Sequence, residues 1–206
     1  MKANLYIVTY SFVLAMVCAL VLTGVGRFTA PYQEANEAAD RFRGILEVLS
    51  VPFDRADPAE QVREIYRRNV REIEHAELTL YELVPTEHID VEPAVAVPFS
   101  GQGLWGPIHG FISLSPDLST IRGLAFVYHE ETPGLGGEIV SENFRRQFEG
   151  KSTVGPDERP GIRILPGTDE RGPNEVDAIT GATMTSEKVE DMINEALREV
   201  LTEHLP

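Results

Sequence analysis

The chain has 206 residues, 42% of them hydrophobic and 25% charged, and its 18 Lys and Arg against 33 Asp and Glu give a formal net charge of −15. This excess of acid argues against a nucleic-acid-binding protein, because contacts with phosphates need a basic face. The single cysteine, Cys18, cannot form an internal disulfide, and the sequence has no CxxC or Cys/His spacing of a zinc site. Stability must therefore come from a hydrophobic core.

The first long apolar segment runs from Leu5 to Val25 and contains no charged residue. As an α-helix it would span about 31 Å, which matches the hydrocarbon core of a bilayer. A secretory signal peptide is the competing interpretation, but its apolar region is shorter, and no good small-x-small cleavage site follows here. We therefore expect a transmembrane helix within residues 1–26. Lys2 before it and the acidic residues after it favour an N-terminus on the inner side.

Helical spacing of apolar residues continues after this segment. It predicts a stalk helix within residues 27–50, which Pro52 ends. A second helix is expected to start at Asp57-Pro58 and to continue through Val70 and Ile73.

Four short segments are typical of β-strands, because they alternate or are rich in β-branched and aromatic residues. They are residues 77–83, 94–98, 109–114 and 123–129. Beyond them, Ser141 is the expected N-cap of a short helix, and the clearest helical pattern covers residues 189–201. Strands followed by helices indicate an α+β fold. The predicted architecture is an N-terminal transmembrane helix followed by one extracytoplasmic α+β domain, residues 51–206, with an antiparallel sheet and flanking helices.

A first glycine-rich segment, Gly101-x-Gly103-x-x-Gly106, fits the spacing of the dinucleotide-binding fingerprint. That fingerprint works only where a helix begins, since the helix N-terminus faces the pyrophosphate. Here Pro107 and a strand-like segment follow, so we expect the glycines to form a hairpin-like turn. Trp105 at the tip of this turn would pack on a ligand or a partner.

A second glycine-rich segment, residues 131–138, has the sequence ETPGLGGE and follows the predicted strand that ends at His129. Its three glycines would let the backbone approach a bulky ligand and turn N–H groups outward. A tight turn with Pro133 at its corner explains the same pattern. The segment by itself leaves both interpretations open.

A third segment, residues 177–186 with the sequence DAITGATMTS, leads directly into the last helix. Ser186 is the expected N-cap, with Glu187 in the first turn. A helix N-terminus carries unpaired backbone N–H groups and the positive end of the helix dipole, so it would hold a phosphate carried on Thr183. Simple capping by threonine and serine is the alternative. The residue pattern alone does not distinguish Thr183 from Thr185 as the carrier.

The run Thr180-Gly-Ala-Thr183-x-Thr185-Ser186 resembles the flavinylation motif of the FMN-binding domain family. In that family, the threonine that closes the Ser/Thr-Gly-Ala-Thr run is joined to FMN through a phosphoester bond. Thr180 stands where serine is commoner, a change that keeps the hydroxyl. Residues 103–111 and 129–139 are similar to the C subunits of sodium-translocating NADH:quinone reductases, and the related G subunits of Rnf electron-transport complexes share the architecture.

The resemblance implies that a separate flavin transferase attaches FMN covalently to Thr183, and that Asp177 is part of the sequence it recognises. It implies no catalytic residue in this chain, and without an HExxH pattern we expect no metal site. The remaining residues expected at the cofactor are Thr180, Gly181, Ala182, Thr185, Glu131, Thr132, Gly134, Leu135, Gly136 and Trp105.

The implied role is that of a redox subunit that crosses the cell inner membrane once and has its C-terminal domain on the periplasmic side. It would pass electrons between redox centres of other membrane subunits of the reductase, while those subunits move sodium. Two alternatives stay open: an anchored extracytoplasmic binding or scaffold domain without flavin, and a flavoprotein reductase that works outside a large complex.

Overall fold

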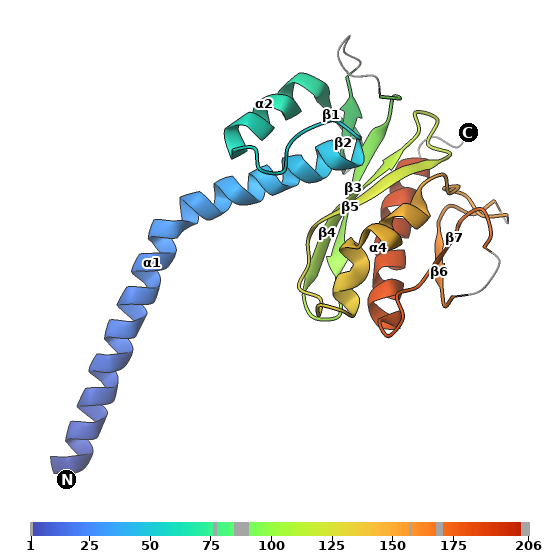
Figure 1. The fold of residues 1–206 in the computed structure, drawn as a ribbon. Helices are drawn as coiled ribbons and strands as arrows, with labels where there is room; N and C mark the ends of the chain where they lie inside the picture. Colours follow the sequence, from blue (N-terminus) through green and yellow to red (C-terminus); the bar gives the residue numbers. More distant parts are fainter. Residues whose placement is uncertain (1, 76–77, 85–90, 157, 168–170, 203–206) are drawn as a thin grey trace. The chain divides into compact units, whose positions relative to one another are not determined.

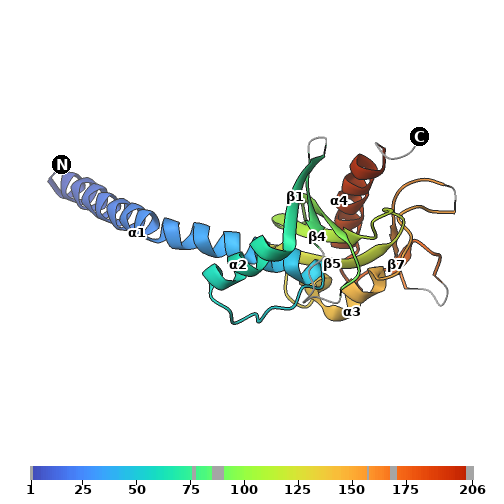
Figure 2. The ribbon, with the colours of Figure 1, turned by 90° about the horizontal axis from the view of Figure 1, so that it is seen from above.

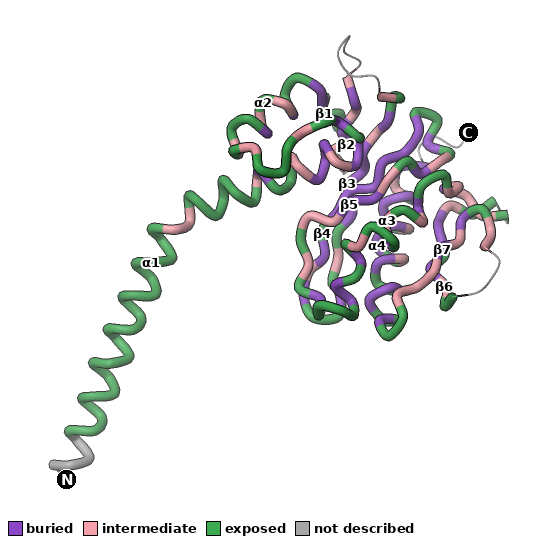
Figure 3. Tube along the Cα trace, viewed as in Figure 1, coloured by how far each residue is buried: buried purple, intermediate pink, exposed green. Residues whose placement is uncertain are grey.

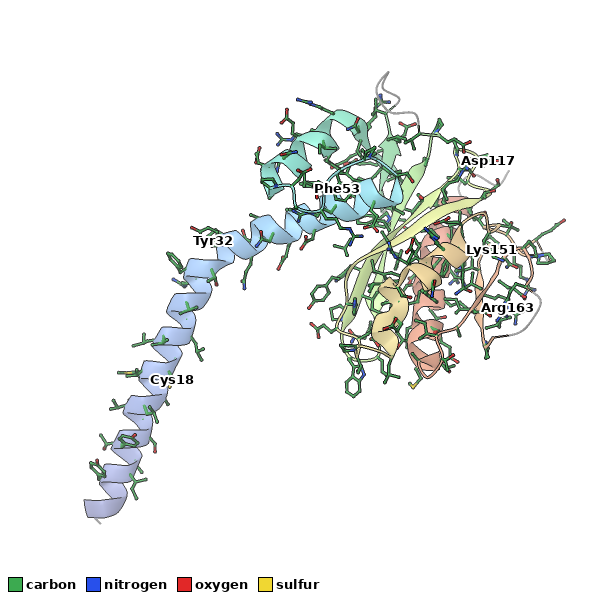
Figure 4. The ribbon with its side chains drawn as sticks, in the orientation of Figure 1. Cys18, Tyr32, Phe53, Asp117, Lys151 and Arg163 are labelled. Carbon is green, nitrogen blue, oxygen red and sulfur yellow. The ribbon has the colours of Figure 1, made fainter. Side chains whose placement is uncertain are left out.

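The computed structural model describes residues 2–75, 78–84, 91–156, 158–167 and 171–202. The chain divides into two compact units, Met1–Ala39 and Asp40–Pro206. Helix α1 (Lys2–Val48) makes up the first unit and continues into the second (Figure 1). It contains a stretch that is long and apolar enough to cross a membrane, judged by length and composition, and none of that stretch is buried. Figure 4 shows its side chains, among them Cys18 and Tyr32, projecting outward from the helix.

The last turn of α1 belongs to the second unit and ends in a hydrogen-bonded turn. The Val51 N–H donates to the Leu46 carbonyl at 2.9 Å, and the Ser50 N–H donates to the Glu47 carbonyl at 3.0 Å. Ser50 has a left-handed φ of 57°. These bonds satisfy carbonyls that a helix end leaves free. Since Leu46 is fully buried, the end of α1 contributes to the core of the second unit.

The second unit is built around an antiparallel sheet of five strands in the order β1-β2-β3-β4-β5. In the β3–β4 pairing, Val95 lies opposite Leu114 and Gln102 lies opposite Pro107. The antiparallel sheet and the four strands predicted from the sequence are confirmed. The strands are β1 (Val70–His75), β2 (Leu78–Leu83), β3 (Val95–Gln102), β4 (Pro107–Leu114) and β5 (Ile121–Tyr128).

The predicted second helix was wrong at its C-terminal end. Helix α2 covers only Ala59–Asn69, and Val70 is already extended, with φ −124° and ψ 133°. Val70 and Ile73 lie in β1, where Val70 is paired with Leu83 of β2. β-Branched side chains suit a strand as well as a helix face. The presence of a partner strand, which the local pattern does not reveal, decides between the two.

Helices cover both faces of the sheet, and each face has its own hydrophobic core (Figures 1 and 2). Helix α4 (Thr183–Thr202) packs on one face, and the end of α1 packs with α2 on the other. Ala96 and Val97 of β3 belong to opposite cores, as the alternation of a strand requires. Figure 3 shows the buried residues gathered along the strands and the inner side of α4.

Short elements connect β5 to α4. They are the 3-10 helix η1 (Gly136–Val140), helix α3 (Glu142–Arg145), the 3-10 helix η2 (Arg146–Phe148), and a parallel pair of strands, β6 (Arg163–Leu165) and β7 (Glu175–Asp177). Ser141 caps α3 as predicted, because its side chain accepts a hydrogen bond from the Phe144 N–H. Neither β6 nor β7 was predicted.

Two polar side chains of α4 hold the segment around β6. Asn194 Oδ1 accepts from the Ile162 N–H at 2.7 Å, and Asn194 Nδ2 donates to the Ile162 carbonyl at 2.9 Å. Glu190 accepts from the Ile164 N–H. Burial raises the pKa of the Glu190 carboxyl above its ordinary value, and the hydrogen bond from Ile164 opposes this rise. The segment that leads through β7 to the start of α4 is thereby tied to α4 itself.

Candidate functional site

Helix α4 begins four residues earlier than predicted. Its first residue is Thr183, and its first turn contains no acidic residue, so Ser186 is not the N-cap and Glu187 is not in the first turn. The Ser186 N–H donates to the Ala182 carbonyl at 3.0 Å. The Ser186 hydroxyl accepts from the Ile179 N–H at 3.1 Å, so it joins the helix to the preceding loop. The prediction was wrong because the motif holds several threonines and a serine that are all suited to a helix start.

The two candidate carriers lie on opposite sides of this first turn. Thr183 is exposed, whereas Thr185 is 1% exposed. Residues two positions apart in an α-helix point in different directions, since each residue turns the helix by about 100°. The Thr185 hydroxyl donates a hydrogen bond of 2.7 Å to Glu131 Oε2 inside the protein. Of these two hydroxyls, only that of Thr183 lies at the surface.

Glu131 connects three parts of the site. This carboxylate is 4% exposed and, besides the bond from Thr185, its Oε1 accepts from the Leu104 N–H at 2.7 Å and from the Trp105 N–H at 3.2 Å. The β3–β4 turn, the glycine-rich loop and the start of α4 therefore meet at one buried side chain. Burying a carboxylate costs free energy unless hydrogen bonds compensate it, and both oxygens of Glu131 have donors.

Glycines allow this close meeting. A Cβ added at Gly136 would overlap Glu131 Oε2 and would lie 2.6 Å from Thr185 Oγ1, so no larger residue fits without displacing them. Gly181 has a φ of +79°, which other residues rarely adopt. A Cβ there would lie 3.3 Å from Leu135 Cδ2. The loop of residues 131–138 thus lies directly against the motif that precedes α4.

The loop itself is a hydrogen-bonded turn. The Thr132 carbonyl accepts from the Leu135 N–H at 3.1 Å and from the Gly137 N–H at 2.9 Å. Thr132 and Gly134 are exposed, and Gly134 has a φ of +75°. The turn keeps Leu135 at the surface, with 45% of its area exposed.

Large apolar side chains remain exposed around Thr183. Trp105 is 68% exposed, and Met184 is 57% exposed. Both adjoin the Glu131 cluster, because the Trp105 N–H is bound to Glu131 and Met184 precedes Thr185. Leu104 and Leu135 are exposed as well. These four residues, which come from the three segments that meet at Glu131, are called the apolar border of the site, and exposed apolar side chains of this kind suit a flat aromatic ligand or a partner surface.

Asp177 lies at the end of β7 and is bound elsewhere. Its Oδ1 accepts from Arg171 Nε at 2.8 Å and from Arg171 Nη2, and its N–H donates to Gln147 Oε1 at 2.7 Å. Arg171 also donates to the Pro166 carbonyl at 2.9 Å. Asp177 therefore does not join the Glu131 cluster through its side chain.

The structure brings most of the predicted residues together. Those at the surface are Trp105, Thr132, Gly134, Leu135, Thr180, Gly181 and Thr183; those buried are Glu131, Gly136, Ala182 and Thr185. The sequence prediction missed Leu104, whose backbone N–H binds Glu131. It also missed Arg171 and Gln147, whose side chains bind Asp177. Met184 was passed over although it lies inside the motif. Among the described residues, no group of three His, Cys, Asp or Glu could hold a metal ion.

Comparison with known families bears directly on this cluster. Residues 103–198 match the FMN-binding domain family, and this segment contains every residue of the site.

Individual proteins are also similar to this chain. The chain is 40% identical over 95 residues to the C subunit of the Na(+)-translocating NADH-quinone reductase of Pasteurella multocida, an alignment that covers 46% of this chain and 36% of that protein. The corresponding protein of Haemophilus ducreyi is 22% identical and is covered to 83%, with 86% of this chain aligned. The chain spans little more than a third of the length of the first relatives it matches, 36% and 38%.

Solved structures show a similar fold. The crystal structure of the C subunit of the Na(+)-translocating NADH-quinone reductase from Parabacteroides distasonis has a TM-score of 0.68 and 27% identity, and the match covers 82% of this chain and 94% of that one. NqrC of Shewanella oneidensis has a TM-score of 0.65 at 21% identity, covering 78% and 91%, which supports the fold alone. The α+β architecture predicted from the sequence is therefore confirmed.

Proposed function

We propose that this chain is a membrane-anchored redox subunit that carries FMN covalently on Thr183 and passes electrons within a sodium-translocating NADH:quinone oxidoreductase. One observation carries the proposal. Within the FMN-binding domain, Thr183 is the exposed first residue of α4, and the nearby alternative, Thr185, is buried with its hydroxyl bound to Glu131.

The residues around Thr183 fit a flavin phosphate. The first turn of a helix has backbone N–H groups without an intrahelical acceptor, and the helix dipole favours negative charge there. The first turn of α4 contains no acidic side chain that would repel a phosphate. Its N–H groups would thus stabilise a phosphoester on the Thr183 hydroxyl.

The apolar border of the site fits the rest of the cofactor. Trp105, Leu135 and Met184 are all exposed, so they could cover the faces of an aromatic ring system and remove it from water. The glycine-rich loop presents little side-chain bulk next to them. When bound, FMN supplies electron transfer, and the protein contributes binding, orientation and electrostatics.

Attachment would need a separate flavin transferase and an activated flavin nucleotide. The Thr183 Oγ–P bond would form as the phosphoanhydride bond of the nucleotide breaks. The other half would leave as a nucleoside monophosphate, which keeps the bridging oxygen and takes up the hydroxyl proton, so the modified chain gains one FMN less one water. Asp177 would belong to the recognised sequence. Its carboxylate is held by Arg171 in the folded domain, so recognition would involve this pair.

The N-terminal helix would anchor the domain in the cell inner membrane, with the domain on the periplasmic side. The apolar stretch of α1 is exposed along its length, which suits contact with lipid. Other membrane subunits would donate and accept the electrons and would move sodium. The names of the relatives described above favour this assembly over an Rnf-type complex, and a permanently attached flavin suits a carrier better than a scaffold domain.

The test is an intact mass and a visible spectrum of the full chain after denaturation, from cells with and without a flavin transferase. Wild type should gain the mass of one FMN less one water and should keep its yellow colour. Thr183→Val should lose both. Thr79→Val is the matched control, because it makes the same change on strand β2, outside residues 103–198, and it should keep both. An unmodified wild-type chain from cells with the transferase would refute the proposal.

A further inference from the structure

We propose that Glu131 is a positioning residue that assembles the attachment site before FMN arrives. It would do so by holding the β3–β4 turn and the first turn of α4 against the glycine-rich loop. This inference rests on the proposed function, since it concerns how Thr183 is presented for modification.

The Glu131 carboxylate binds residues that are far from it in the sequence. Its hydrogen bonds reach Leu104 and Trp105, 27 and 26 residues before it, and Thr185, 54 residues after it. No other side chain in the described part of the site receives donors from both the turn and α4. Removing Glu131 would therefore release two segments at once, rather than weaken one local contact.

The Glu131 carboxylate is tightly packed between neighbouring segments. A Cβ added at Gly103 would overlap Glu131 Oε1, and one added at Gly136 would overlap Oε2. The two oxygens thus lie against two glycines from different segments. This tight fit predicts that the length and shape of the side chain matter, and that its ability to accept from backbone N–H groups matters as well.

Conservative variants separate geometry from charge. In Glu131→Gln the amide oxygen can accept from the Leu104 and Trp105 N–H groups, and the amide nitrogen can donate to Thr185 Oγ1. In Glu131→Asp the charge stays, but the side chain is one methylene shorter and cannot reach both segments. A positioning role therefore predicts that glutamine rescues the site and that aspartate and alanine do not.

Trp105 offers a readout that needs no cofactor. It is the only tryptophan in the chain, and its backbone N–H is one of the donors to Glu131. In the full-length chain in detergent micelles, overall tumbling is slow, so the fluorescence anisotropy of Trp105 reports the motion of its turn. We expect a loss of anisotropy in Glu131→Ala and Glu131→Asp, and wild-type anisotropy in Glu131→Gln.

The second readout is the rate of flavin attachment to the full-length chain by a flavin transferase. Glu131→Ala should be about fivefold slower or more. In this variant the released form of the site should predominate, and each loss of about 1 kcal/mol of ordering then lowers the population of the assembled site by about this factor. Glu131→Gln should match wild type. Glu138→Ala is the control, since it removes an exposed carboxylate of the same loop, and it should also match wild type.

The outcomes decide between the claims. Wild-type anisotropy and attachment in Glu131→Ala, or a defect in Glu131→Gln as large as that in Glu131→Ala, would overturn the positioning role. If circular dichroism shows that Glu131→Ala does not fold, the same two measurements are made on Glu131→Asp. Wild-type anisotropy and attachment rate in Glu131→Asp would then overturn the inference. A wild-type chain that never receives flavin would refute the proposed function, while the anisotropy comparison would still test Glu131.

Discussion

The buried hydrogen bond from Thr185 to Glu131 gives a quantitative prediction. Thr185 is 1% exposed, and its hydroxyl donates to Glu131 Oε2 at 2.7 Å. Thr185→Val keeps the shape of the side chain but removes this hydroxyl. A hydrogen bond to a charged group contributes about 1.5–3 kcal/mol. Because Glu131 keeps two backbone donors, we expect a loss of about 2 kcal/mol. That loss lowers the Tm of a domain of this size by about 4–8 °C.

Thr183→Val is the matched control for this measurement, because the same substitution lies two residues away in the same helix at an exposed position. Exposed substitutions of this kind change stability by about 0.5 kcal/mol or less. Thermal unfolding of the unmodified full chain, followed by circular dichroism, should thus separate the two variants. Flavin attachment should also separate the two variants. It should be lost in Thr183→Val and still occur in Thr185→Val, but more slowly than in wild type, because the bond between α4 and Glu131 is gone. Equal Tm values for the two variants would refute the burial argument.

Three further predictions concern the support of the site. Glu190→Gln should raise the Tm relative to wild type at pH 7 but not near pH 4. Because the carboxyl pKa of Glu190 is raised in the folded protein, wild-type stability falls as pH rises above about 4.5, and glutamine removes that loss while it still accepts from the Ile164 N–H. A Tm difference that does not depend on pH would contradict this reasoning. Asn194→Ala should lower the free energy of unfolding by about 2–4 kcal/mol, because it leaves the N–H and the carbonyl of Ile162 without their hydrogen-bond partner. In thermal unfolding, this loss should be larger than that of Asn194→Asp, which keeps only the acceptor. Gly181→Ala should lose about 1–2 kcal/mol from its φ of +79°, measured as a lower Tm, and an unchanged Tm would show that the turn relaxes.

The elements that were predicted correctly have strong periodic signals. Helix α4 has an apolar face that recurs over several turns, and strands β2 to β5 are rich in residues that favour a pleated, half-buried surface. Strand β1 was missed because Val70 and Ile73 extend the spacing of the preceding helix. Only its pairing with β2, in which Val70 meets Leu83, resolves that ambiguity.

The candidate site shows a similar division. The glycine-rich loop and the threonine motif could be found in the sequence, because such closely spaced glycines or threonines are uncommon in ordinary helices and strands. The partners of Glu131 could not, since two of them are backbone N–H groups in a turn 26 and 27 residues away. The choice between Thr183 and Thr185 also depends on the rotation of α4 against the sheet, which burial reveals and the motif does not.

Covalent attachment to Thr183 is tested by locating the flavin within the chain. The full-length protein, isolated from cells that contain a flavin transferase, would be digested, and the yellow peptide would be sequenced by tandem mass spectrometry. We predict a single flavin phosphate ester on Thr183. A flavin on Thr180 or Thr185, or a peptide of residues 177–188 that carries no flavin at all, would contradict this assignment.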